Sequence, residues 1–398
     1  MQSAWLILVR TLRVSFYLRV LVLAWVGVIL TQWGWSLIES AVDSAESLPR
    51  ITAQVALPQS VPAAETGPIL KFEFTDGQVP QAPYSEDKAN FESWLGDHFR
   101  ANSLGPVVGG WRWLGEPFLR IFQMEMGMAA SMQLVLCGTW AIGVWGLLGG
   151  AIARIAACQL TREESLGPVA ALKIAASNWT ATVGAPLIGL TIAGLMCLPL
   201  ACVGFLMRIE FFAAIAGLLW GLMLLWGLVM AVVLVALWLG WPLAWATIGV
   251  EQSDAFDAAS RTAAYVYQRP LHYCFYILVA TCLGMAGQLF VAGITPVGSE
   301  LAEWAVSWGA STEWLTQLVT PPVDETAADA LSTSAAWGSW GILSWKSVLS
   351  SLSAGYAVAF MWTASVGIYL LLRQHVDDTD LEELDGSTTP HSQRNHQD

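Results

Sequence analysis

The sequence is short of charged side chains. Only 12% of its 398 residues are Asp, Glu, Lys or Arg, and 55% are hydrophobic, whereas about a quarter of the residues in a soluble domain are charged. A transmembrane helix needs about 20 apolar residues. The sequence therefore predicts an all-α integral membrane protein with about six transmembrane helices. The windows that lack Asp, Glu, Lys, Arg and His are 20–38, 126–153, 174–207, 211–250, 273–299 and 347–372.

Cysteine is scarce outside these windows. Five of the six cysteines lie inside them, and Cys158 lies at a membrane edge, so small apolar packing is favoured over a disulfide framework. The chain also has no His-Glu-x-x-His motif, no Gly-x-Ser-x-Gly motif and no pair of intramembrane aspartates. We therefore expect no catalytic residue, no metal site and no cofactor. The net charge of −13 argues against nucleic acid as a partner.

Basic residues are distributed unevenly around the windows. Lys and Arg gather at the N-terminus, in segment 154–173 and in segment 251–272, whereas segment 300–346 has one lysine and six acids. Cytoplasmic loops are enriched in Lys and Arg. Both termini are therefore predicted to be cytoplasmic. Window 211–250 is interpreted as one tilted span that breaks near Gly240-Trp241-Pro242, and two spans are the alternative.

Two cytoplasmic segments resemble each other. EESLGPVAALKIAASNW at 163–179 aligns with EQSDAFDAASRTAAYVY at 251–267 with a constant offset of 88, and six of seventeen positions match. Each segment follows one window and precedes another, which predicts a parallel internal repeat of span, cytoplasmic amphipathic helix and span. The two helices are expected at 161–178 and 253–269. Four of the matches are alanine, so chance similarity is the alternative.

The second copy contains the strongest candidate site residues. Ser253 is expected to cap the helix, and Asp257 and Arg261 have the i,i+4 spacing of an ion pair. Arg261 and Arg269 could also bind a lipid phosphate, and Lys173 takes the place of Arg261 in the first copy. Asp257, Arg261, Arg269 and Lys173 are thus candidates for structural pairing or for lipid-headgroup binding.

The windows divide the chain into six segments. Tryptophan prefers the headgroup level of a bilayer, so a helix over 301–318 and the residues Trp304, Trp308, Trp337, Trp340 and Trp345 are predicted interfacial anchors. The expected segments are 1–38, the cytoplasmic N-terminus and first span; 39–125, an extracytoplasmic loop forming an outer cap, with a short helix at 86–101; 126–299, a four-span repeat core; 300–346, an extracytoplasmic Trp-rich interfacial segment; 347–372, the last span; and 373–398, an acidic disordered cytoplasmic tail.

The stretch SDAFDAASRTAAYVYQRPLHY resembles the helix between spans in a group of uncharacterised bacterial multi-span membrane proteins, which is related to the membrane domain of glycerophosphodiester phosphodiesterases. Asp254, Ala255, Ser260 and Arg261 carry the resemblance, and the first copy lacks the aspartate. The resemblance covers residues 130–295. It implies a multi-span helical domain in a bacterial cytoplasmic (inner) membrane, without an established chemistry.

Two classes of function follow. A non-enzymatic membrane scaffold, or an accessory subunit of a membrane complex, is favoured by the lack of charged and nucleophilic groups in the windows. The alternative is a transporter or lipid-handling protein, which the repeat and the prolines inside the windows support. The expected partners are membrane lipid, a second copy of the chain or another membrane protein. Close helix contacts are predicted at the small-xxx-small pairs Gly146/Gly150 and Gly217/Gly221. Packing within the bundle is favoured, and contact between protomers is the alternative.

Overall fold

The computed structural model describes residues 6–42, 105–121, 128–319 and 332–377, and each regular element in these ranges is a helix. Six helices are long and apolar enough to cross a membrane, which confirms the predicted class and number of spans. The helix predicted at 86–101 and the tail from residue 378 lie outside the described residues. The six helices are α2 (Leu18–Val42), α6 (Met128–Thr161), α8 (Trp179–Leu206), α10 (Trp220–Glu251), α12 (Pro270–Ser307) and α15 (Thr333–Asp377).

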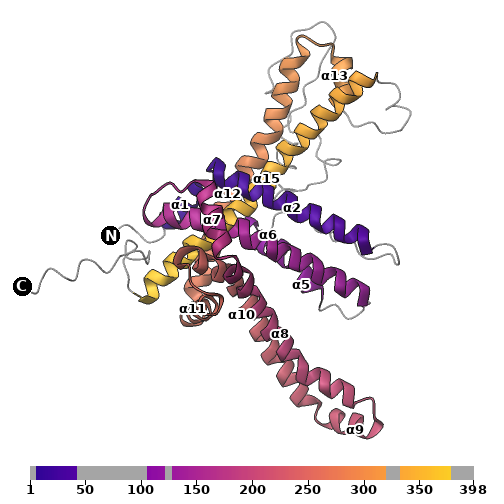
Figure 1. Ribbon diagram of the computed structural model, residues 1–398, viewed down its shortest axis with the longest axis vertical. Coiled ribbons are helices and arrows are strands. Elements are labelled where there is room, and N and C mark those ends of the chain that lie inside the picture. Colours follow the sequence, from indigo (N-terminus) through magenta and orange to yellow (C-terminus); the bar gives the residue numbers. More distant parts are fainter. Residues whose placement is uncertain (1–5, 43–104, 122–127, 320–331, 378–398) are drawn as a thin grey trace, which may run out of the picture.

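Three two-helix limbs diverge from a common hub (Figure 1). The first limb pairs α2 with α6, the second pairs α8 with α10, and the third pairs α12 with α15. Helix α9 (Glu210–Leu218) closes the second limb, and α13 (Thr312–Val319) lies at the tip of the third. The hub contains three short helices and the ends of α10 and α15. The short helices are α1 (Leu6–Ser15), α7 (Pro168–Ser177) and α11 (Ala255–Gln268).

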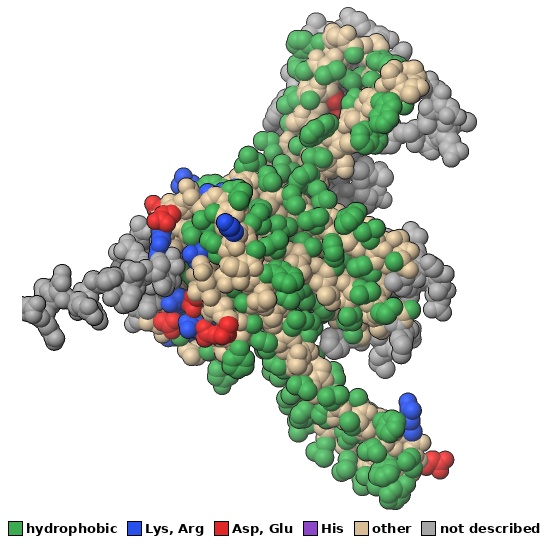
Figure 2. Space-filling model, viewed as in Figure 1, with side chains coloured by type: hydrophobic (Ala, Val, Ile, Leu, Met, Phe, Trp, Pro, Cys, Tyr) green, Lys and Arg blue, Asp and Glu red, His purple; other side chains and the backbone are tan. Residues whose placement is uncertain are grey.

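Charge and apolar surface are segregated along this architecture. In Figure 2 the acidic and basic side chains gather at the hub, and the surfaces of the limbs are mostly hydrophobic. Arg208 lies in the turn between α8 and α9, and Glu210 is the first residue of α9 at the tip of the second limb. Hydrocarbon tolerates apolar side chains and excludes charge. The hub and the limb tips are therefore the parts of the molecule suited to water and lipid headgroups.

Helix α15 is the central helix of the fold. Every residue from Ser353 to Leu372 is buried, and α15 packs against all three limbs and against the hub helices α1 and α11. The last span was predicted at 347–372, but α15 begins at Thr333 and ends at Asp377. The five residues 373–377, predicted as the start of the tail, are therefore helical.

The structure of the Trp-rich interfacial segment predicted at 300–346 differs from the prediction. The expected helix at 301–318 is wrong as a single element, because α12 ends at Ser307 and α13 begins at Thr312. Gly309 lies in the turn between them, where its N–H donates to the Val306 carbonyl at 3.1 Å. An ion pair of 2.8 Å between Lys346 and Glu303 then holds the start of α15 against α12. The segment is thus the outer part of the third limb.

Helix α10 has two contrasting parts. Each residue from Pro242 to Val250 is buried, whereas Ala216 is the one buried residue between Glu210 and Trp241. The break predicted at Gly240-Trp241-Pro242 is wrong, because α10 continues through Pro242 to Glu251 and the interruption lies at Leu219. Close packing in the hub supports the helix beyond the proline, since a Cβ on Gly249 would lie 2.6 Å from the Cβ of Ala153.

Helix α5 (Gly105–Arg120) is an element that the sequence did not predict. It lies in the segment expected to form an outer loop, yet it packs against α6, α12 and α15. Trp111 and Trp113 are almost completely buried. Glycine and proline spaced along α5 allow neighbouring helices to approach, and a Cβ on Gly110 would lie 2.7 Å from the Met361 sulfur. The six-window count missed α5 because the helix is short and carries three charged residues.

The two hub helices are shorter than predicted. Helix α7 covers 168–177 rather than 161–178, because α6 continues to Thr161 and Pro168 occupies the first turn of α7. Helix α11 covers 255–268 rather than 253–269, and its cap is Asp254, not Ser253. The Asp254 carboxylate accepts a hydrogen bond of 2.7 Å from the Asp257 N–H. Helix α11 packs on α10 and α8, and its buried residues are Ala258, Thr262 and Tyr265.

A chain of tryptophan side chains crosses the core. Successive ring centroids are separated by 5.5, 6.3, 6.0, 4.8 and 5.7 Å. The chain joins α2, α5, α6, α15 and α10, and Trp362 of α15 stacks on Trp245 with an interplanar angle of 14°. We call this set the tryptophan chain. Its members are, in order, Trp35, Trp113, Trp145, Trp362, Trp245 and Trp241.

The first prediction concerns this chain. Trp362→Ala should lower the free energy of unfolding by about 3–5 kcal/mol, because a large cavity would replace a fully buried indole. The matched control is Trp345→Ala on the same helix, where the indole is 74% exposed, and it should change stability little. Thermal unfolding of the purified protein in mild detergent measures both effects. Equal melting temperatures for the two variants would contradict the central role of Trp362.

Candidate functional site

The end of α10 is the centre of a charge network at the hub. Glu251 is the last residue of α10, and its side chain is 11% exposed. One carboxylate oxygen accepts a hydrogen bond of 2.7 Å from Arg261 of α11. The other accepts one of 2.5 Å from Arg373 of α15 and one from the hydroxyl of Tyr369. A single carboxylate thus connects α10, α11 and α15.

Local backbone conformation brings these groups together. Gln252 adopts a left-handed conformation with φ of 56° immediately after Glu251, and Asp254 then starts α11. A non-glycine residue in this region costs about 1–2 kcal/mol. The short reversal lays α11 beside the end of α10, so that Arg261 can reach back to Glu251.

The predicted pair of Asp257 and Arg261 belongs to the same network. The Arg261 Nε donates to Asp257 Oδ1 at 2.9 Å, as the i,i+4 spacing predicts. The hydrogen bond to Asp257, followed by the charge of Glu251, raises the pKa of Arg261, while partial burial opposes the rise. Asp257 and Arg261 are more than 40% exposed, whereas Arg373 is 16% exposed. Glu251 and Arg373 are therefore the desolvated part of the network.

The last turn of α15 makes the remaining contacts. Tyr265 of α11 donates to Asp377 at 2.6 Å, and burial, reinforced by this bond, raises the pKa of the phenol. Arg373 Nε lies 3.7 Å from Asp377, which is an ion pair but too long for a hydrogen bond. His375 lies 3.4 Å from the Tyr276 hydroxyl at the start of α12. The end of α15 is thus held between α11 and α12.

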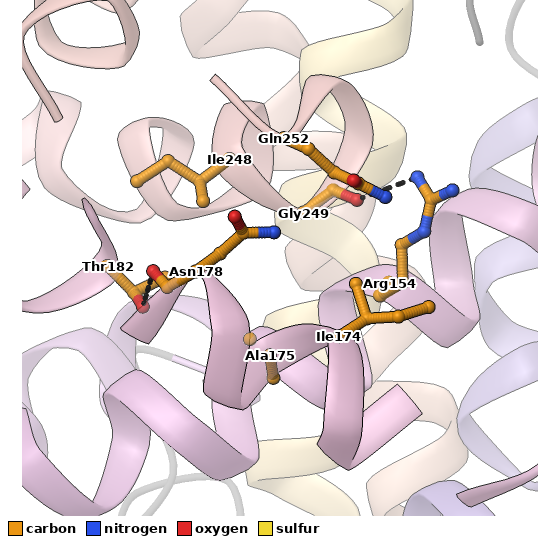
Figure 3. A pocket seen from close by; sticks show the side chains of 9 residues that line it. Arg154, Ile174, Ala175, Asn178, Thr182, Ile248, Gly249 and Gln252 are labelled. Atoms are coloured by element: carbon orange, nitrogen blue, oxygen red, sulfur yellow. Dashed lines mark hydrogen bonds between the residues drawn. The ribbon is translucent and has the colours of Figure 1, made fainter. Parts of the chain in front are cut away.

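A small pocket lies on the other side of the α10 terminus (Figure 3). It has room for about one water molecule. Arg154 of α6 donates to the carbonyl of Val250 at 3.0 Å. A cation is stabilised at this position, because the C-terminus of α10 is the negative end of the helix dipole. Asn178 and Gln252 direct their amide groups towards the pocket. The full lining is Gly150, Arg154, Ile174, Ala175, Asn178, Thr182, Ile248, Gly249 and Gln252.

The remaining predicted site residues lie apart from the network. Lys173 is exposed on α7, and Arg269 is exposed where α12 begins. The predicted tryptophan anchors are on the third limb, at the end away from the hub. Trp304 is half-buried and contacts Trp308 at 4.9 Å between ring centroids. The other anchors, Trp308, Trp337, Trp340 and Trp345, are between 66% and 74% exposed.

The central residues of the network were not singled out from the sequence. Glu251 was visible only as the end of an apolar window and as the partner of Glu163 in the aligned segments. Arg373 and Asp377 have i,i+4 spacing just after the last window, which was a usable signal for an ion pair. Their contact with α10 and α11 depends on tertiary packing. No family model, curated protein or solved structure matches the chain.

The second prediction separates the desolvated part of the network from its exposed part. Glu251→Gln should lower the free energy of unfolding by about 3–5 kcal/mol, because Arg373 would lose its nearer charge partner and keep only Asp377 at 3.7 Å while remaining largely buried. Asp257→Asn should cost about 0.5 kcal/mol or less, since its pair with Arg261 is exposed. Melting temperatures in detergent provide the comparison. A larger effect at Asp257 would show that Glu251 is not the centre of the network.

Proposed function

We propose that this protein is a non-enzymatic membrane scaffold or accessory subunit, and that its α8–α10 limb binds transmembrane helices of another membrane protein. The observation that carries the proposal is the isolation of this limb. Among the described residues, the part of the limb beyond Trp238, which contacts Gly115 of α5, packs chiefly on itself. One such contact is the hydrogen bond of 2.9 Å from Trp226 to the Met196 carbonyl. A scaffold needs such a surface free for its partner.

Glycine favours a helix as the occupant of this surface. Within the part of the chain that the structure describes, a Cβ at any of five glycines on the limb would meet no atom outside its own stretch of helix within 4 Å. Small residues allow helices to approach closely in a membrane, where van der Waals packing drives association. Gly146 meets Val183 and Trp179 inside the fold, whereas Gly217 and Gly221 face open space. The five open glycines are Gly194, Gly204, Gly217, Gly221 and Gly227.

The proposal includes an orientation of the protein in the membrane and an internal repeat. The hub would face the cytoplasm, in agreement with the basic residues near α1, α7 and α11. Two units, α6–α7–α8 and α10–α11–α12, would form the parallel repeat. In each unit one non-glycine residue, Glu163 or Gln252, has positive φ just after a long helix, which supports a shared way of turning. The resemblance to membrane domains of the phosphodiesterase-related group stays a prediction.

Lipid handling is the second candidate, and the surface of α11 favours it. This helix has a buried face, a charged face and a third face that is apolar and exposed. Phe256 and Tyr267 on the third face are 72% and 87% exposed, and Leu271 at the start of α12 is 82% exposed. They lie near the exposed Arg269 and His272. Aromatic and basic groups in this arrangement are suited to the headgroup layer.

The third prediction tests the partner helix. A photo-crosslinking residue placed at Leu225 should form an adduct with one membrane protein in native membranes. Gly221→Leu should abolish the adduct, because the extra side chain would block close approach without a clash inside the chain. The control is Gly298→Leu on α12, which also faces open space and should leave the adduct intact. Adducts with lipid alone would contradict the scaffold and favour lipid handling.

The fourth prediction tests the orientation. A reporter fused after residue 398 should be cytoplasmic, and a reporter inserted within 320–331 should be on the opposite side of the membrane. Both follow from six spans and from the basic residues of the hub segments. Paired alkaline phosphatase and green fluorescent protein fusions measure the two sides. The same side for both insertions would mean that α15 does not cross the membrane.

A further inference from the structure

Helix α5 lies at the depth of the transmembrane helices. A Cβ on Gly105 would lie 2.6 Å from the methyl group of Thr281, and Thr281 is about 16 Å along α12 from its first residue at the hub. Gly110 faces Met361, which is about 24 Å along α15 from its last residue at the hub. The hydrocarbon core of a bilayer is about 30 Å thick. With the hub at one membrane surface, α5 lies within the thickness of the bilayer.

Three charged residues lie further along α5. The neighbouring Trp113 contacts Trp145, which is about 14 Å along α6 from Arg154 at the hub. A Cβ on Gly138 would lie 2.4 Å from the ring of Phe118, and Gly138 is about 24 Å along α6 from Arg154, so Arg112 and Glu116 lie between these two depths.

Glu116 lies between two arginines at i,i+4 spacing, with 3.6 Å to Arg112 Nε and 3.0 Å to Arg120 Nε. The side chains of Glu116 and Arg120 are 15% and 10% exposed, whereas the side chain of Arg112 is 63% exposed. Arg120 therefore neutralises the buried carboxylate from inside the protein. Glu116 in turn holds the guanidinium of Arg112 at the surface.

The open side of α5 is a single helical face. The residues of α5 that are not fully buried recur every three or four positions, which places them together on one side of the helix. The rest of α5 is enclosed by protein. The open face carries the exposed guanidinium and the edge of its glutamate partner. Its residues are Val108, Gly109, Arg112, Glu116, Phe118 and Leu119.

Lipid is an unfavourable neighbour for this face. A charged side chain at the centre of a transmembrane helix costs about 2.5–3.5 kcal/mol on insertion scales, and charges inside membranes usually face a water-filled cavity or the protein interior. Arg112 does not face the protein interior, because its side chain is 63% exposed. We propose that the open face of α5 lines an aqueous vestibule that enters from the side opposite the hub, and that Arg112 is its anion-binding group.

The chemistry of the ligand follows from the guanidinium. Arginine presents a planar set of N–H donors that matches a carboxylate or a phosphate. Glu116 lies 3.6 Å from the Arg112 Nε, which is too long for a hydrogen bond, so this pairing does not use up the donors of the guanidinium. The ligand is an anionic carboxylate or phosphate group, either free in water or on a lipid headgroup. This inference is independent of the scaffold proposal.

Thiol labelling tests the vestibule. In a variant without native cysteines, Arg112→Cys should react with a membrane-impermeant reagent at least ten times faster than Leu228→Cys, when the reagent is added to sealed vesicles on the side opposite the hub. Leu228 is the matched control, because it is 63% exposed but lies on the apolar surface of α10. The Leu114→Cys variant, at a buried position on α5, should not react. Labelling of Arg112→Cys at the Leu228→Cys rate, or only from the hub side, would overturn the vestibule.

Protection from labelling tests the anion. Leu119 shares the open face and is 43% exposed, so the Leu119→Cys variant with Arg112 intact reports on occupancy. Inorganic phosphate should slow its reaction with an uncharged impermeant reagent in phosphatidylcholine nanodiscs, and Arg112→Gln should remove the effect. Slowing only in phosphatidylglycerol nanodiscs would assign the anion to a lipid headgroup. Equal rates under all conditions would overturn anion binding, and unchanged melting temperatures would exclude misfolding as the cause.

Discussion

The burial of α15 is the constraint around which the three limbs are arranged. A helix whose residues from Ser353 to Leu372 are all buried must be enclosed on every side, so α2, α6, α10 and α12 each contribute a face to it. The enclosure ends at the hub, where α15 emerges with Arg373 and Asp377. At this point the surroundings change from apolar to charged, and Glu251 ties the emerging turn to α10 and α11. The position of the network thus follows from the position of the helix it closes.

The tryptophan chain also helps to enclose α15, because its large side chains surround Trp362. Trp362 lies between Trp145 and Trp245, so three helices meet through stacked rings. The indole N–H groups of Trp245 and Trp362 make no hydrogen bond within the described part of the chain, although an unsatisfied buried donor is costly. Trp241 lies perpendicular to Trp245 at 90°. This arrangement brings the edge of one ring to the face of another, which aromatic pairs prefer.

The sequence predicted what depends on composition and local spacing. Uncharged windows identified the six long helices, and i,i+4 spacing identified the Asp257–Arg261 contact. Features that depend on tertiary packing were missed. A break was expected near Pro242, yet the buried residues after it keep α10 intact. Helix α5 looked like part of a loop, because Arg112, Glu116 and Arg120 broke the apolar pattern. Glu251 acquires its role only because a residue in left-handed conformation turns α11 back towards it.

The hub network around Glu251 and the charged cluster of α5 are stabilised in different ways. At the hub, Glu251 is shared among Arg261, Arg373 and Tyr369, and each partner comes from an element that must be in place for the limbs to meet. Within α5, the charges are paired along one helix, so that their pairing needs no other limb. The hub network therefore couples the arrangement of the limbs to one carboxylate, whereas the α5 cluster persists if the limbs move. A partner that changes the angle of the α8–α10 limb would strain the hub network through Glu251, and it would reach α5 through the contact between Trp238 and Gly115.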